Sequence, residues 1–117
     1  MIKEYLEKSI AVKNAALVDQ EFLGNAEKAG QTIHDALMAG RRIYIAGVGG
    51  AAAEAQHFSA ELLGKYKSMR KAFPAVALTT DTSLLTAWAN DTSFDFIFSR
   101  QLEGLGQKED IFVALSA

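Results

Sequence analysis

A histidine and a glutamate four residues apart carry the clearest chemistry in this sequence. His57 and Glu61 lie in an alanine-rich segment that we expect to be helical. Residues at positions i and i+4 lie on the same face of a helix. An imidazole and a carboxylate placed side by side can transfer protons or bind a metal ion, so the pair predicts acid–base or metal chemistry.

A glycine-rich turn precedes this helix. The apolar run Ile43–Ala46 is followed by Gly47-Val48-Gly49-Gly50. The free N–H groups and the dipole at the start of a helix bind anions such as phosphate. Phosphate at one end of the helix and acid–base or metal chemistry along it would suit an enzyme that acts on a sugar phosphate.

Each motif also has a simpler interpretation. The glycines can form an ordinary tight turn between a strand and a helix. They are not a Walker loop, because no Gly-Lys-Ser/Thr follows, and the third glycine of the dinucleotide fingerprint is replaced where Ala53 or Glu54 stands. His57 could be a packed, hydrogen-bonded residue, and Glu61 could belong to a solvated face or form a simple pair. The residues alone leave these alternatives open.

Composition narrows the class of protein. The chain has 117 residues, of which 50% are hydrophobic and 22% charged, so we expect one domain with a packed core. The net charge of −2 and the scattered basic residues argue against a nucleic-acid partner. There is no cysteine, no apolar run long enough for a membrane span, and no order of residues typical of a signal peptide. We therefore expect a cytoplasmic protein without a membrane partner.

The first 40 residues read as two helices. Residues 2–20 form an apolar face with Ile2, Leu6, Ile10 and Leu17. We expect a break at Gly24-Asn25, and then a second helix over residues 26–38 that ends at a Gly40 cap. This N-terminal helical segment, residues 1–40, is predicted to mediate oligomerisation.

Residues 41–117 read as alternating strands and helices. We predict strands over residues 42–46, 75–78 and 111–115, with helices over 51–66, 81–89 (capped by Thr80 or Asp81) and 93–105. A βαβαβ order implies a parallel sheet, and its ligands bind beyond the carboxyl ends of the strands. The loop 47–51, the turn 79–83 and Ser116 should meet at that edge. The fold class is therefore α/β, a flavodoxin-like parallel sheet with flanking helices, preceded by a helical pair.

From about residue 42 to residue 116 the chain resembles the SIS (sugar isomerase) domain, and within it the phosphoheptose isomerases. Four phrases in this order carry the resemblance: Ala55-Gln56-His57-Phe58-Ser59-Ala60-Glu61-Leu62, Pro74-Ala75-Val76-Ala77-Leu78-Thr79-Thr80-Asp81-Thr82-Ser83, Ala89-Asn90-Asp91, and Phe98-Ser99-Arg100-Gln101-Leu102-Glu103-Gly104-Leu105-Gly106. The resemblance implies an aldose–ketose isomerase that interconverts sedoheptulose 7-phosphate and a heptose 7-phosphate.

The resemblance also implies roles for individual residues. His57 and Glu61 would be zinc ligands, and Glu61 would in addition be the base that moves a proton between C1 and C2 of the substrate. The expected substrate-binding residues are Val48, Gly49, Gly50, Glu61, Asn90, Asp91 and Ser116. The family typically assembles as a homotetramer, which we expect of the complete protein.

Several departures from the family pattern qualify these expectations. Val48 and Ala51 replace the usual Asn and Ser of the loop, and Ala117 stands where a threonine is usual. The family's remaining zinc ligands, a Gln and a His, fall in a later region, so the chain looks truncated and its zinc site incomplete. The alternative function is a non-catalytic SIS module that binds a phosphosugar or another protein. A third interpretation is a structural fragment whose N-terminal helices form a bundle.

Overall fold

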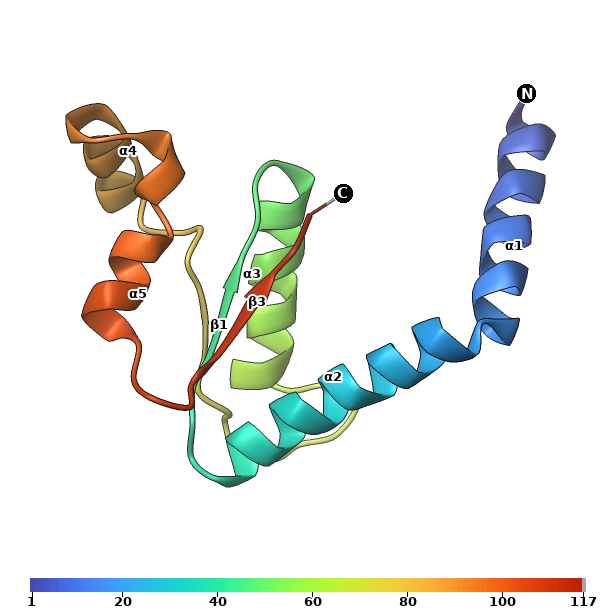
Figure 1. Ribbon diagram of the computed structural model, residues 1–117, viewed down its shortest axis with the longest axis horizontal. Helices are drawn as coiled ribbons and strands as arrows, with labels where there is room; N and C mark the ends of the chain where they lie inside the picture. The colour runs from blue at the N-terminus through green and yellow to red at the C-terminus, as the bar shows by residue number, and fades with distance from the viewer. Residues whose placement is uncertain (117) are drawn as a thin grey trace. The chain divides into compact units, whose positions relative to one another are not determined.

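The computed structural model describes residues 1–116, and the interpretation of Ala117 lies outside the described residues. Helices and strands alternate after an N-terminal helical segment (Figure 1). Their bounds are α1 Ile2–Val18, α2 Gln20–Met38, β1 Ile43–Ala46, α3 Gly50–Leu63, β2 Ala75–Ala77, α4 Thr82–Asp91, the 3₁₀ turn η1 Phe94–Phe96, α5 Ser99–Leu105 and β3 Ile111–Ala114.

Two compact units make up the chain, the first being Met1–His34 and the second beginning at Asp35. The predicted break at Gly24-Asn25 was wrong, since α1 ends at Val18 and α2 runs through both residues. Asp19 makes the break instead, because its carboxylate accepts the N–H of Phe22 at 3.0 Å and starts a new helix. No helix among residues 1–116 is long and apolar enough to cross a membrane.

A parallel sheet forms the centre of the second unit. The strand order is β2-β1-β3, with Ile43 in register with Ala75 on one side and Ile111 on the other. All four residues of the central strand β1 are buried, whereas β3 alternates between half-buried and exposed residues. The predicted α/β fold with a parallel sheet and flanking helices is confirmed.

Helices cover both faces of this sheet (Figure 1). Tyr44 and Ala46 of β1 pack with Leu78 against Phe98 and Leu102, at and within α5. The Tyr44 hydroxyl donates to the carbonyl of Leu105 at 2.8 Å, which ties the end of α5 to β1. Alternate residues of a strand point to opposite faces, so Ile43 and Ile45 face α3. Helix α5 on one face of the sheet and helix α3 on the other therefore flank the edge at which the strands end.

The predicted helix over residues 93–105 was wrong as a single element. The Ser93 hydroxyl accepts the N–H of Asp95 at 3.1 Å and starts the short turn η1, and α5 begins only at Ser99. Buried Gln101 then donates to the carbonyls of Leu78 and Ile97, both at 2.9 Å. These two bonds hold α5 against the end of β2 and fix the segment that carries Phe98. The predicted cap at Asp81 is confirmed, because its carboxylate accepts the N–H of Leu84 at 3.0 Å.

The carboxylate of Asp110 joins β1 and β3 at the amino ends of these strands. Asp110 accepts the N–H of Arg42 at 2.9 Å and the N–H of Gln107 at 2.8 Å. Burial by itself raises the pKa of Asp110, but the two backbone hydrogen bonds and the charges of Arg42 and Arg41 outweigh it. The pKa of Asp110 therefore lies below its usual range.

Candidate functional site

The turn between β1 and α3 requires glycine at two positions. A Cβ on buried Gly47 would lie 2.6 Å from the carbonyl oxygen of Ala51, and Gly49 has a φ of +66°. The second value belongs to the left-handed region that glycine adopts without steric penalty. The turn therefore brings the first residues of α3 directly over the end of β1.

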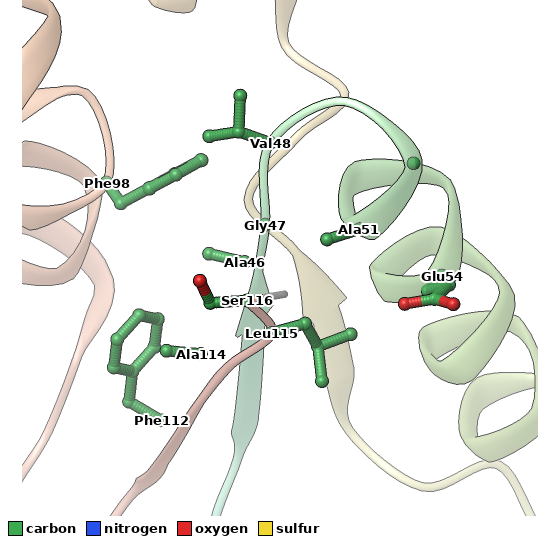
Figure 2. A pocket seen from close by; sticks show the side chains of 11 residues that line it. Ala46, Gly47, Val48, Ala51, Glu54, Phe98, Phe112, Ala114, Leu115 and Ser116 are labelled. Carbon is green, nitrogen blue, oxygen red and sulfur yellow. The ribbon is translucent and has the colours of Figure 1, made fainter.

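A pocket of about 580 Å³ lies at this edge (Figure 2). The loop supplies Gly47, Val48 and Gly50, and the segment after β3 supplies Leu115 and Ser116. Phe98 and Phe112 form an apolar wall, with the side chains of Ala46, Ala51, Glu54 and Ala114 completing the lining. The structure thus brings together three of the predicted substrate-binding residues: Val48, Gly50 and Ser116.

The polar groups of this pocket are few. The Ser116 hydroxyl and the Glu54 carboxylate are its polar side-chain groups, and Val48 is 59% exposed. No side chain caps the N-terminus of α3, and the N–H of Ala52 donates to the carbonyl of Gly49 at 3.1 Å. The N–H groups of Gly50 and Ala51, which come before it, are the ones that face a ligand of the pocket. Such N–H groups, with the helix dipole behind them, are suited to an anion.

His57 and Glu61 lie in direct contact on α3. His57 Nε2 is 2.9 Å from Glu61 Oε1, and the two side chains are 77% and 39% exposed. They line a hollow of about 440 Å³ together with Ala53, Glu54 and Phe58. An imidazole this exposed is not packed, but it is hydrogen-bonded to Glu61, so the interpretation as a simple surface pair also fits this geometry. The pair is free to meet a ligand from solvent.

Glu54 connects the two hollows, and sequence reasoning missed it. It lines both the pocket at the glycine turn and the hollow at His57 and Glu61. Its signal in the sequence is the helical spacing 54, 57, 61, which repeats i, i+3, i+7 along one face. A ligand that filled both hollows would pass beside its carboxylate.

The donors of the pair suit zinc in type but supply only part of a site. Imidazole nitrogen and carboxylate oxygen are ordinary zinc ligands, and a protein zinc site uses three or four of them. Among residues 1–116 no group of three His, Cys, Asp or Glu side chains is close enough together to hold a metal ion. In the described part of the chain, His57 and Glu61 therefore supply no more than two of the ligands that such a site needs.

Gly49, Asn90 and Asp91 are predicted substrate-binding residues that do not line the pocket at the glycine turn. Gly49 lines an adjoining apolar hollow of about 270 Å³, together with Thr79. Asn90 and Asp91 are exposed at the end of α4, where the Asn90 amide donates to the Asp91 carboxylate at 3.3 Å. Neither lines the pocket that holds Ser116. The edge predicted as one site is therefore two adjoining hollows with Asn90 and Asp91 outside them.

Comparison with known proteins places the chain in a family. The model of the SIS domain matches residues 4–117. A phosphoheptose isomerase of a Bradyrhizobium species is 48% identical over 99% of this chain, and one of Campylobacter concisus is 55% identical over 80%. This chain covers 59% and 50% of those two relatives, so it spans little more than half of their length.

Solved structures agree with the sequence relatives. A phosphoheptose isomerase from Neisseria gonorrhoeae matches 99% of this chain with a TM-score of 0.89 and 38% identity. One from Francisella tularensis matches 99% with a TM-score of 0.91 and 30% identity. The chain covers 59% and 60% of these two structures. The chain belongs to the SIS domain family, and its similar relatives are phosphoheptose isomerases.

Proposed function

We propose that the protein carrying this chain is an aldose–ketose isomerase of sedoheptulose 7-phosphate. One observation carries the proposal: a single helix, α3, has an uncapped N-terminus at a pocket and an exposed imidazole–carboxylate pair further along the same helix. The names of the relatives agree with this chemistry.

The spacing along α3 suits an extended substrate. At 1.5 Å per residue, Glu61 lies about 16 Å along the axis from Gly50, and its side chain leans back toward the helix start. An open-chain heptose with phosphate on its last carbon is shorter than this separation, so it can present C1 and C2 near Glu61 only because the glutamate side chain reaches back toward the turn that holds the phosphate. The shared lining residue Glu54 marks the path between the two ends.

In the proposed reaction Glu61 removes a proton from the carbon beside the substrate carbonyl and returns it to the neighbouring carbon. The double bond shifts so that an enediolate forms. The proton of the neighbouring hydroxyl passes to the former carbonyl oxygen, and reprotonation on the other carbon exchanges aldose and ketose. Zinc held partly by His57 Nε2 and Glu61 Oε1 would supply positive charge that stabilises the oxyanion. Backbone N–H groups at Gly50 and the Ser116 hydroxyl would hold the phosphate.

Glu61→Gln in the full-length protein tests the assignment. The amide keeps the shape of the carboxylate but is not a useful base, so we expect turnover of sedoheptulose 7-phosphate to fall roughly 10²- to 10⁴-fold. The KM should change little, because the phosphate contacts are distant. Glu103→Gln removes a carboxylate that is exposed on α5 and serves as the control. Unchanged turnover in Glu61→Gln would contradict the proposal.

A non-catalytic phosphosugar-binding module is the second candidate. Val48 and Ala51 favour it, because neither side chain offers a hydrogen bond to a ligand in the pocket. A wild-type protein that binds the sugar phosphate but never converts it would support this candidate. Conversion by wild type together with loss of conversion in Glu61→Gln would exclude it.

The proposal extends to assembly and location. Apolar side chains on α1 are exposed, with Ile2 at 79%, Leu6 at 59%, Ile10 at 56% and Leu17 at 70%. Burial of such a stripe between copies would stabilise a helical bundle, so we propose a homotetramer joined through this helix. We also propose a cytoplasmic location, since a charged phosphate ester stays in the compartment in which it is made.

A further inference from the structure

The helix that carries Glu61 ends two residues later, and its last turn needs hydrogen-bond donors. Helix α3 ends at Leu63, and the last four carbonyls of a helix lack intrahelical partners. The N–H of Gly64 donates to the carbonyl of Ala60 at 2.8 Å. The carbonyls of Glu61 and Leu62 therefore need donors from outside the helix.

Arg70 supplies them. It lies in the loop between α3 and β2, and its guanidinium donates to the carbonyl of Glu61 through Nη2. Nη1 donates to the carbonyl of Leu62 at 2.9 Å and, more weakly, to those of Gly64 at 3.2 Å and Lys71 at 3.1 Å. A planar fork of donors can span neighbouring carbonyls in this way, whereas a lysine ammonium acts as a point charge.

The guanidinium is itself held in place. Its carbon lies 4.5 Å from the centre of the Phe73 ring, a cation–π distance. The N–H of Phe73 donates to the carbonyl of Leu62 at 3.1 Å, so the same loop is anchored twice to the last turn of α3. A positive charge at this end of a helix is also favoured by the helix dipole.

We propose that Arg70 is a positioning residue for Glu61. This inference rests on the proposed function, in which Glu61 is the proton-transfer base. Arg70 does not line the hollow that holds His57 and Glu61. It fixes the backbone of the turn from which the Glu61 carboxylate projects toward His57. Reacting groups must be placed to within a fraction of an ångström, so a frayed last turn would misplace the base while leaving the phosphate end of the pocket intact.

The test compares Arg70→Gln with Lys71→Gln in the full-length protein. Both variants remove one positive charge from the same loop, but Lys71 is exposed and only its backbone carbonyl contacts Arg70. For Arg70→Gln we expect kcat to fall roughly 10- to 10²-fold with KM changed less than about 3-fold. Amide hydrogen exchange in a peptide covering residues 58–66 should become faster. Lys71→Gln should change neither measurement.

A double variant separates positioning from a general structural role. If Arg70 acts through Glu61, then Arg70→Gln should lower kcat less than about 3-fold once Glu61 is already Gln, because residues that act as a unit are not additive. An equal fold-loss in both backgrounds overturns the proposal, as does a folded Arg70→Gln protein with unchanged kcat. If Arg70→Gln does not fold, Arg70→Lys, which keeps the charge, takes its place with the same criteria.

Failure of the proposed function and failure of the positioning role of Arg70 would give different results. A wild-type protein that does not isomerise sedoheptulose 7-phosphate contradicts the proposed function and, with it, the catalytic purpose of the Arg70 contacts. An active wild-type protein whose double variant shows additive losses contradicts only the positioning role of Arg70.

Discussion

Replacing Gly47 by alanine tests the packing on which the pocket depends. The added Cβ would lie 2.6 Å from the carbonyl oxygen of Ala51 and 2.7 Å from its Cβ. Non-bonded carbon atoms approach to about 3.5 Å, so the methyl group is roughly 0.8 Å too close to Ala51 Cβ. Backbone atoms at the start of α3 cannot rotate away as a long side chain can. We therefore expect a loss of about 1–3 kcal/mol in the free energy of unfolding, the range for an overpacked interior.

Thermal unfolding of the full-length protein measures this loss. The relatives of this chain are long enough that a change of 1 kcal/mol shifts Tm by about 2–4 °C, so Gly47→Ala should lower Tm by roughly 2–12 °C. Gly50→Ala is the matched control, because a Cβ there meets nothing within 4 Å and no positive φ is required. Its Tm should stay within a few degrees of wild type or rise slightly. A Gly47→Ala protein as stable as Gly50→Ala would refute the packing argument.

The sheet was predictable because its signals are local and strong. The buried run Ile43–Ala46 lies between Arg42 and a glycine turn, and a short apolar run bounded in this way is typical of a strand that is buried on both faces. The βαβαβ order then fixed parallel pairing, which the register confirms. Asp81 was a predictable cap, since aspartate before an apolar helix satisfies the first free N–H groups.

Two predicted helix boundaries were wrong, because a capping side chain nearby had a stronger effect than the residues on which the prediction relied. Glycine and asparagine weaken a helix by only about 1 kcal/mol or less each, so α2 continues through Gly24 and Asn25. Asp19 ends one helix and caps the next, and that effect was stronger. Ser93 has the same effect before η1. Its hydroxyl accepts the N–H of Asp95, which would otherwise be available to a continuous helix.

The site was predictable only as far as one helix reaches. Spacing along the chain predicted that His57 and Glu61 would meet, and they lie 2.9 Å apart. Spacing cannot reveal residues that the fold brings in from elsewhere. Phe98 reaches the pocket only because Gln101 ties α5 to the end of β2, and Arg70 reaches the carbonyl of Glu61 only because the loop after α3 folds back.

Two further predictions concern assembly and pH. Light scattering at micromolar concentration should give four times the mass of one chain, and a monomer would contradict the proposed tetramer. Asp110→Asn should destabilise the protein at pH 7, because the wild-type carboxylate accepts the N–H groups of Arg42 and Gln107 and its pKa is lowered on folding. A lowered pKa stabilises the fold above the unfolded-state value of about 3.9, and this contribution is lost as the pH falls through the folded-state value. The stability difference between wild type and Asp110→Asn, measured by urea unfolding, should therefore be constant from pH 7 to about 5 and shrink below about 4. A difference that stayed constant down to pH 2 would show that the carboxylate charge contributes nothing at this junction of β1 and β3.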